Sequence, residues 1–337
     1  MKCLVFALPL LAMGLTSCDK AKKAVEAARN KIEGVKDPTL PKPPGGEVAS
    51  GLVPQVDTAA EGVRFRRDLP FPSNLEVRVT HRVTFHNTRR IVTSALGSDK
   101  ITANGAFEIV GFLQRSGPQL ALTIERAGPV IDPKEAVEKA KASAQGAPPP
   151  EPEPFVGTRV EFQHGKGGWA LPAQKGAVDF NRKLLEQNLL PNLSGLLVQH
   201  GIMPRKQWFS SSRRWIGGDK LVLEGDSLAL LFENGAKGKV TLTYEVSEAL
   251  EGHPCGRFSV QGDVSLNNET TFDGTTQSGE MTIQSGKVWC SLLHPVVLRE
   301  EYQTVRTVTE GVANGPKTKI QGGIDELRVR QWKSQDQ

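Results

Sequence analysis

Two cysteines of the chain lie close to histidines, in the stretches His253-Pro-Cys255 and Cys290-Ser-Leu-Leu-His294. In an extended strand, side chains two or four positions apart point to the same face, so each histidine would share a face with its cysteine. The four side chains could hold one zinc ion as a Cys2His2 site, although their spacing matches no standard zinc hairpin. Cys255 and Cys290 could instead form a disulfide, or remain free thiols that pack as small hydrophobic residues. All three interpretations make the site structural.

The amino terminus has the composition of an export signal. Lys2 supplies a positive charge, and residues 4–13 form an apolar stretch that is too short to span a bilayer. The stretch ends in LTSC, residues 15–18, and charged residues follow at once. This junction resembles the lipobox of bacterial lipoproteins, in which the cysteine is acylated with fatty acids such as palmitate and becomes the first mature residue.

The resemblance implies that residues 1–17 are a signal peptide and that Cys18 anchors the protein in a lipid bilayer. Each buried acyl methylene contributes about 0.8 kcal/mol, so several chains on one cysteine make the attachment effectively permanent. We therefore expect a lipid-anchored protein of the bacterial cell envelope with its folded domain in the periplasm; inner and outer membrane both stay open. Thiols oxidise in such a compartment, which favours a Cys255–Cys290 disulfide over the zinc site and the free thiols.

Composition and motifs exclude several classes of function. Removal of residues 1–17, in which Lys2 is the one charged residue, leaves 320 residues and lowers the formal net charge from +5 to +4. An excess of this size allows a general affinity for anionic envelope surfaces and does not indicate nucleic-acid binding. The sequence contains neither GxxxxGK[ST] nor GxGxxG. We expect no cofactor.

The mature chain divides into a tether and one folded domain. Residues 18–57 contain the lipidation site, a short helix rich in Ala, Lys and Glu, and a stretch rich in Pro and Gly that disfavours both helix and sheet. We assign residues 58–332 to a single β-rich domain and residues 333–337 to a tail. Within the domain, residues 131–155 contain PPPEPEP and are predicted to form a Pro-rich surface excursion.

Alternation of apolar and polar residues predicts the strands. Residues 75–85 alternate throughout, with Leu, Val, His and Phe against Glu, Arg and Thr. The same period of two recurs at residues 119–125, 239–246 and 279–284. Turns that contain Gly or polar residues separate these runs, so neighbouring strands are expected to pair as antiparallel hairpins with one apolar face.

One apolar stripe has helical rather than strand spacing. It occupies residues 178–200, where Phe180 and leucines from Leu184 to Leu197 recur every three or four positions and Pro191 must kink the helix. Such a stripe needs a partner surface, and the apolar face of the sheet is the obvious one. The expected fold class is mainly β (α+β), with a long, curved antiparallel sheet or open half-barrel packed on a kinked central helix. This arrangement resembles the half-barrel lipoprotein carriers of the bacterial envelope.

A second stretch interleaves cations with aromatic residues. It runs from Arg205 to Trp215 as RKQWFSSSRRW. Its side chains, above all those of Trp208, Arg213, Arg214 and Trp215, could bind an anionic headgroup or a glycan. The alternative is a surface loop whose two tryptophans fold back onto the core, because tryptophan is usually largely buried.

The leading functional hypothesis is a non-enzymatic binding or scaffold module. A long twisted sheet does not close tightly around a single helix, so an apolar cavity that holds a lipid tail could remain on its concave face. The alternative is that the leucines from Leu184 to Leu197 fill this cavity completely. The alternative function is an envelope hydrolase with a dispersed active site. Neither GxSxG nor HExxH occurs, and His81, His164 and His200 are scattered, so the sequence predicts no catalytic residue.

Overall fold

The computed structural model describes residues 46–94, 97–117, 119–130, 156–165, 168–170, 202–232, 235–272, 275–312 and 317–334. Three expected features lie outside these residues: the anchor at Cys18, the Pro-rich excursion at residues 131–155 and the helix at residues 178–200.

Long antiparallel strands make up most of the described chain. The strands are β1 (Thr58–Ala59), β2 (Gly62–Val63), β3 (Asn74–Ser94), β4 (Gly97–Ser116), β5 (Gln119–Pro129), β6 (Arg159–Gly165), β7 (Gly168–Ala170), β8 (Lys220–Glu224), β9 (Lys237–Leu250), β10 (His253–Phe272), β11 (Thr275–Ser291), β12 (Val297–Val312) and β13 (Lys317–Ser334). Two short 3-10 helices, η1 (Val53–Gln55) and η3 (Gly225–Leu230), accompany them.

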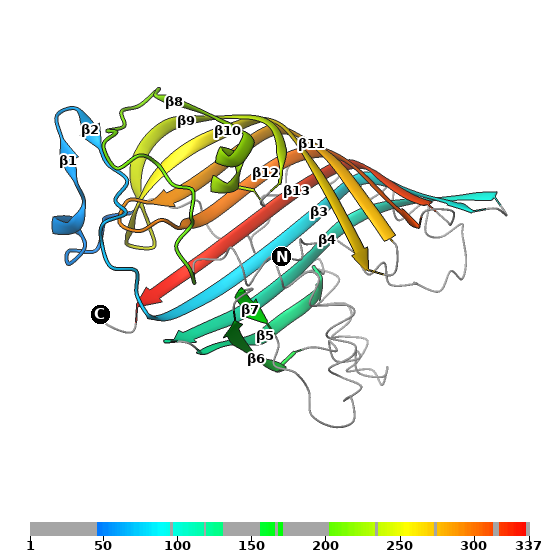
Figure 1. Ribbon diagram of the computed structural model, residues 1–337, viewed down its shortest axis with the longest axis horizontal. Coiled ribbons are helices and arrows are strands. Elements are labelled where there is room, and N and C mark those ends of the chain that lie inside the picture. Colours follow the sequence, from blue (N-terminus) through cyan, green and yellow to red (C-terminus); the bar gives the residue numbers. More distant parts are fainter. Residues whose placement is uncertain are drawn as a thin grey trace, which may run out of the picture.

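Eleven strands form one open sheet in the order β7-β6-β5-β4-β3-β13-β12-β11-β10-β9-β8, and β1 and β2 form a separate hairpin. Strands β3 to β7 and strands β8 to β13 each follow one another in chain order, so each half of the chain is a meander. Pairing of β13 with β3 joins the two meanders in the middle of the sheet. Figure 1 shows the resulting curved sheet, with β8, β9 and β10 arching at one side and the β3–β4 hairpin projecting at the far end.

Bulges interrupt the strand pairing and add to the curvature. The register shifts between Phe85 and Thr88 in the β3–β4 pair, where Asn87 has a φ of 49°. It shifts again between Val260 and Gly262 in the β10–β11 pair. A Cβ at Gly262, whose φ is +146°, would lie 2.2 Å from a backbone oxygen of β9, so only glycine permits this close approach. Bulges of this kind bend a strand and increase its local twist.

One face of the sheet, called the core face below, carries two separate apolar clusters. The C-terminal apolar cluster lies on β8 to β12 and includes Val240, Leu242, Tyr244, Phe258, Val260, Ile283 and Val288. The N-terminal apolar cluster lies on β3 to β6 and includes Leu75, Val77, Val79, Ile109, Leu113, Leu122 and Ile124. Full burial of one such side chain contributes about 1.5–3 kcal/mol, so these two clusters are the main source of the stability of the fold.

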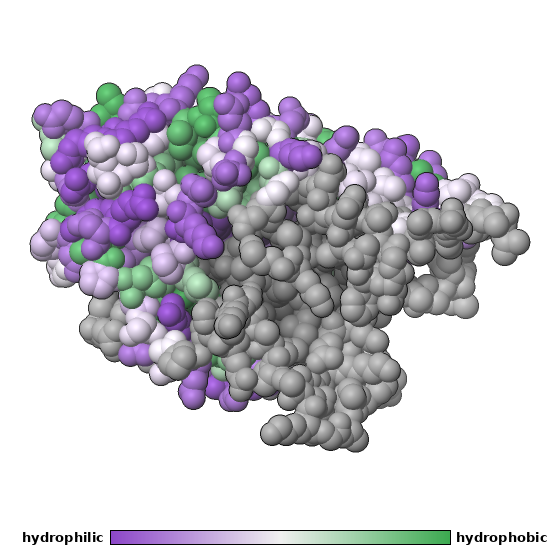
Figure 2. Space-filling view, in the orientation of Figure 1, coloured by the Kyte–Doolittle hydropathy of each residue, from purple (hydrophilic) through white to green (hydrophobic). Residues whose placement is uncertain are grey.

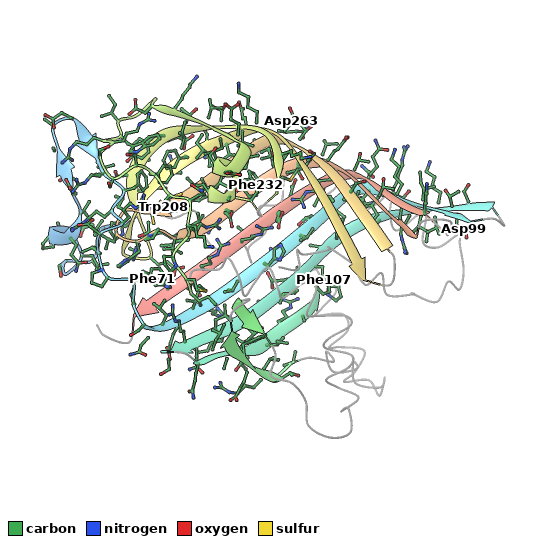
Figure 3. The ribbon with its side chains drawn as sticks, viewed as in Figure 1. Phe71, Asp99, Phe107, Trp208, Phe232 and Asp263 are labelled. Atoms are coloured by element: carbon green, nitrogen blue, oxygen red, sulfur yellow. The ribbon has the colours of Figure 1, made fainter. Side chains whose placement is uncertain are left out.

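Residues 202–215, called the crossing segment below, run from one apolar cluster to the other. Ile202 belongs to the N-terminal apolar cluster, whereas Trp208 and Phe209 belong to the C-terminal one. Backbone hydrogen bonds fix the segment: the Arg205 N–H donates to the Pro295 carbonyl (2.9 Å), and the Trp215 N–H donates to the Val63 carbonyl (2.8 Å). Figure 3 shows Trp208 at the end of the sheet opposite to Asp99, which marks the projecting β3–β4 hairpin.

The structure confirms the expected fold class: the protein is mainly β, and its principal sheet is long, antiparallel and open. The four stretches with a period of two lie in β3, β5, β9 and β11, as the alternation predicted. Within the described ranges, no helix has the length and apolar character that a membrane crossing requires. Hydrophilic residues predominate on the described surface in Figure 2, with smaller hydrophobic areas between them.

Candidate binding site: a buried charge cluster on the core face

A row of side chains across the core face changes from apolar to charged and back to apolar. Directly opposed residues on antiparallel strands share a face, so the strand register defines such rows. From β9 to β5 this row consists of Tyr244, Phe258, Val288, Glu300, Arg328, His81, Ile109 and Ala127. The three polar members lie on β12, β13 and β3, between the two apolar clusters.

Neighbouring side chains extend these three residues into a larger group, called the charge cluster below. Its sheet members are His81, Glu300, Tyr302, Arg306, Glu326, Arg328 and Arg330, and Arg205 joins it from the crossing segment. Glu300 and Arg330 are at most 1% exposed. A group of charges this deeply buried is costly unless its members pair with one another.

Glu326 is the centre of one half of the charge cluster. Its carboxylate accepts a hydrogen bond from His81 Nε2 (2.8 Å) and pairs with Arg328 Nη2 (2.5 Å) and with Arg306. Burial opposes ionisation of the carboxyl, but the two guanidinium groups and the His81 hydrogen bond outweigh it and hold the pKa of Glu326 well below its ordinary value. Glu326 is therefore a carboxylate at neutral pH.

Glu300 is the centre of the other half. Its Oε2 accepts a hydrogen bond from Arg330 Nη2 (2.6 Å) and lies 3.9 Å from Arg328 Nη1, and its Oε1 accepts one from the Tyr302 hydroxyl (3.4 Å). Burial again favours the neutral acid, and the nearby arginines overcome it, so the pKa of Glu300 is lowered. Arg328 thus bridges the two carboxylates.

His81 is neutral in this environment. Burial lowers its pKa, and the repulsion by Arg328 and Arg306 adds to the effect, although the Glu326 carboxylate acts in the opposite direction. A neutral ring that contacts a carboxylate through Nε2 must carry its proton on that nitrogen. The described charge cluster therefore contains four guanidinium groups, on Arg205, Arg306, Arg328 and Arg330, and only two carboxylates.

The predicted disulfide is wrong, because the two cysteines lie on opposite faces of the sheet. Cys255 is opposite Ser291 in the β10–β11 register, and Cys290 is opposite Gly256. Since residues 255 and 256 alternate between the faces, the two sulfur atoms point away from each other. Both cysteines are buried free thiols, and burial raises the pKa of each. Neither the strand register nor the face of each cysteine could be predicted from the spacing, and this one-residue offset in the register excludes the bridge.

The alternative zinc site fails for the same reason. Cys290 packs in the C-terminal apolar cluster, whereas Cys255 packs with Trp289 in a separate cluster. The rings of His253 and His294 both make edge contacts with Trp332, at centroid distances of 5.5 and 5.2 Å. Among the residues that the structure describes, no group of His, Cys, Asp or Glu side chains could hold a metal ion.

His253 also contacts a serine, a pairing that could suggest a hydrolase. His253 Nε2 lies 2.8 Å from Ser291 Oγ. Ser291 is 0% exposed, however, and its Oγ also accepts the backbone N–H groups of Leu293 and His294 at 3.1 Å each. The two backbone N–H groups occupy both lone pairs of the hydroxyl oxygen, so the Ser291–His253 pair stabilises the turn after β11 and is structural.

The predicted ligand-binding residues of the crossing segment are already engaged within the protein. Trp208 and Trp215 are 9% and 1% exposed and pack with Phe65, Phe209, Tyr244 and Phe258, which agrees with the alternative that they fold back onto the core. Arg213 stacks over the Trp215 ring at 3.7 Å. Arg214 Nη2 donates to Asp57 Oδ1 (2.7 Å), and this bond lowers the pKa of Asp57.

The charge cluster was not predicted from the sequence. In β13, Glu326, Arg328 and Arg330 alternate with Leu327 and Val329, which is the ordinary pattern of a strand with one face in water. The structure buries the charged face as well as the apolar one. Only the pairing of β13 with β3 reveals this, because it places the charged positions opposite His81 and between two apolar clusters.

Comparisons with known proteins leave the chain without a family: no family model matches it, and no curated protein matches it. Two solved structures of botulinum neurotoxin, one of type C and one of the serotype C1 binding domain, are 7% and 8% identical to it. They cover 77% and 75% of this chain and 78% of their own chains, with TM-scores of 0.10 and 0.09. At such TM-scores the likeness carries no argument about fold or function.

Proposed function

We propose that the protein is a lipid-anchored binding module of a bacterial cell envelope, and that its ligand is amphipathic and binds at the core face. The anchor is the acylated Cys18 that the LTSC junction predicts. The ligand's charged group would lie at the charge cluster, and its apolar part would lie against the neighbouring apolar clusters.

The row from Tyr244 through Glu300, Arg328 and His81 to Ala127 is the observation that carries this proposal. A protein that needed only a stable core would gain nothing from the charges, since replacing buried ion pairs by well-packed apolar residues is often neutral or stabilising. A costly polar group between two apolar surfaces is typical of a binding site, where apolar walls surround a few converging polar groups.

A scaffold without a ligand is the competing proposal. In that case, the cluster would serve only to fix the register of β12, β13 and β3, because buried ion pairs can specify one arrangement of a core. The hydrolase alternative rests on the Ser291–His253 contact, and the two backbone N–H groups that already occupy the Ser291 oxygen argue against it.

The experiment is to purify the full-length protein in a neutral maltoside detergent and identify by mass spectrometry the molecules that an organic solvent extracts from it. The binding proposal predicts one class of amphiphile at close to one molecule per chain. Phe107 lies on the core face beside Val83, in the row next to Glu326, and packs against the N-terminal apolar cluster. Phe107→Ser should therefore lower the occupancy.

Ile101→Ser is the matched control, because Ile101 lies on the same strand and is 49% exposed. It should leave the occupancy unchanged. If the folded wild-type protein carries no more lipid than an unrelated lipoprotein purified in the same way, the binding proposal is wrong and the scaffold takes its place.

A further inference from the structure

Arg205 is held at the charge cluster by contacts that use only part of its guanidinium group. Its Nη1 donates a hydrogen bond to the Leu230 carbonyl (2.7 Å), and its backbone N–H donates to the Pro295 carbonyl (2.9 Å). The first contact holds the guanidinium at the end of η3, and the second ties the backbone of the crossing segment to the residues before β12. The position of the guanidinium is thus determined by the protein and not by an anion.

The remaining edge of the Arg205 guanidinium has no partner among the described residues. Nε and Nη2 are inaccessible to water, and neither makes a hydrogen bond in the described structure. These two nitrogens lie on one edge of the planar group, and their N–H bonds point the same way, which is the geometry that binds two oxygens of a carboxylate or phosphate at once. A buried donor that lacks a partner costs about 1–3 kcal/mol, and a charged one costs more.

Other buried donors of the crossing segment are also unpaired. The buried side-chain atoms without a partner in the described chain are Arg205 Nε and Nη2, Trp208 Nε1, Trp215 Nε1 and His294 Nδ1. Four of the five are N–H donors from the crossing segment, and no oxygen is among them. Each of these four groups therefore lacks a hydrogen-bond acceptor, and Arg205 is the one among them that carries a charge.

Glu300 is the carboxylate whose charge acts on Arg205, but it makes no hydrogen bond to the Nε–Nη2 edge. Its own contacts in the described structure are with Arg330, Arg328 and Tyr302. Burial disfavours the charged guanidinium and lowers the pKa of Arg205, so an added anion would restore the balance.

We propose that the Nε–Nη2 edge of Arg205 binds an oxyanion, and that this oxyanion is a phosphate group. The two unpaired N–H groups of this edge are the reason for proposing an oxyanion. The choice of phosphate rests on the proposed function, because an anchored protein faces a phospholipid surface; the phosphate could belong to a lipid headgroup or be a free ion. On this proposal Arg205 is the residue that selects the charged end of the ligand.

The test measures binding to the full-length protein in a neutral maltoside detergent by isothermal titration calorimetry. Three probes are used: inorganic phosphate, dihexanoyl phosphatidic acid, and dihexanoylglycerol, which has the same acyl chains without the phosphate. We expect phosphatidic acid to bind at least tenfold more tightly than dihexanoylglycerol if the source is a lipid headgroup. If the source is a free ion, inorganic phosphate binds as tightly as phosphatidic acid.

Two variants test the role of the guanidinium edge. Arg205→Met should weaken phosphate binding at least tenfold, and Arg205→Lys, which keeps the charge but lacks the two-donor edge, should weaken it as well. Lys206→Met removes a neighbouring exposed charge from the same segment and should leave binding unchanged. Circular dichroism and the melting temperature identify any variant that fails to fold, and Arg205→Lys is the milder substitution.

The outcomes separate this inference from the proposed function. If the wild-type protein binds dihexanoylglycerol but neither phosphate probe, the inference is wrong and the binding module stands. Phosphate binding that Arg205→Met and Arg205→Lys leave unchanged also overturns the inference. If none of the three probes binds, the inference is wrong, and the lipid extraction described above decides whether the binding module stands.

Discussion

His81 and Glu326 are 245 positions apart in the chain, yet His81 Nε2 lies 2.8 Å from a carboxylate oxygen of Glu326. The contact exists because β13, the last strand, pairs with β3, the first long one. Each half of the chain forms its own meander and its own apolar cluster, and the charge cluster forms only where the two halves meet. The charge cluster can therefore form only after the two halves of the chain have paired.

Glu326→Gln should strongly destabilise the protein. The substitution removes the charge that pairs with Arg306 and Arg328, which leaves Arg306 without a carboxylate partner and Arg328 with Glu300 alone. Breaking a buried pair in this way costs about 3–5 kcal/mol. Urea denaturation followed by tryptophan fluorescence would measure the loss in the free energy of unfolding.

Asp325→Asn is the matched control for this substitution. Asp325 is adjacent to Glu326 on β13 but points to the opposite face, where its Oδ2 pairs with His86 Nε2 at 2.9 Å in an exposed contact. Exposed pairs contribute about 0–1 kcal/mol, so this variant should stay close to the wild-type protein. Equal losses for Glu326→Gln and Asp325→Asn would show that the burial of the charge cluster is of no energetic consequence.

Stability should fall as the pH is lowered from about 6.5 towards 4, because burial lowers the pKa of three histidines, His81, His253 and His294. Burial lowers the pKa of His253 to about 3 and that of His294 to about 4, against an ordinary value of 6.5. The unfolded chain binds these protons at a higher pH than the folded chain does. The stabilisation that the neutral histidines provide is therefore complete above pH 6.5. It is lost progressively as the pH falls from 6.5 towards their pKa values in the folded protein.

Each histidine that is protonated only in the unfolded chain lowers the free energy of unfolding by about 1.4 kcal/mol for every pH unit below 6.5 in this window. The double variant His253→Gln, His294→Gln should show a flatter dependence of the unfolding free energy on pH between 6.5 and 5. Glu300 and Glu326 act at lower pH, because their pKa values lie below the ordinary value of 4.5. The same slope in the wild type and the double variant over this range would contradict the assignment.

Sequence patterns predicted most of the sheet because its strands follow the simple rule of one apolar and one polar face. The alternation at residues 75–85 correctly identified part of β3, and similar runs identified β5, β9 and β11. Pairing of β13 with β3 could not be predicted in this way, since alternation says which residues share a face and not which strands are neighbours. The helix expected at residues 178–200 lies outside the described residues.

The candidate site escaped prediction because charge on a strand usually indicates a face in water. The sequence pattern suggests that Arg330 and Glu300 are solvent-exposed, but both are buried in the structure, where two apolar clusters flank the charge cluster. The cysteines show the opposite case, in which the sequence predicted a contact that the structure does not contain. Their spacing and compartment favoured a bridge, but a difference of one position in the register sent Cys255 and Cys290 to opposite faces.

The two cysteines should therefore be free thiols in the purified protein. Neither should react with iodoacetamide in the folded state, because both are buried and burial raises the pKa of each thiol. Mass spectrometry after denaturation without a reductant should show both of them alkylated, and a reductant should leave the melting temperature unchanged. Unlabelled thiols in the unreduced, denatured protein would restore the disulfide.

Cys18→Ser tests the anchor on which the proposed function depends. The LTSC junction predicts that Cys18 is acylated and becomes the mature amino terminus, so a serine at this position should release the protein from the membrane or leave it unprocessed. Fractionation of cells into membrane and soluble protein, with the mass of the mature amino terminus, measures both effects. Ser17→Ala is the control, because a small residue at this position keeps the pattern intact. A Cys18→Ser protein that is still cleaved and still bound to the membrane would mean that the chain is held there by contacts of the folded domain rather than by acyl chains.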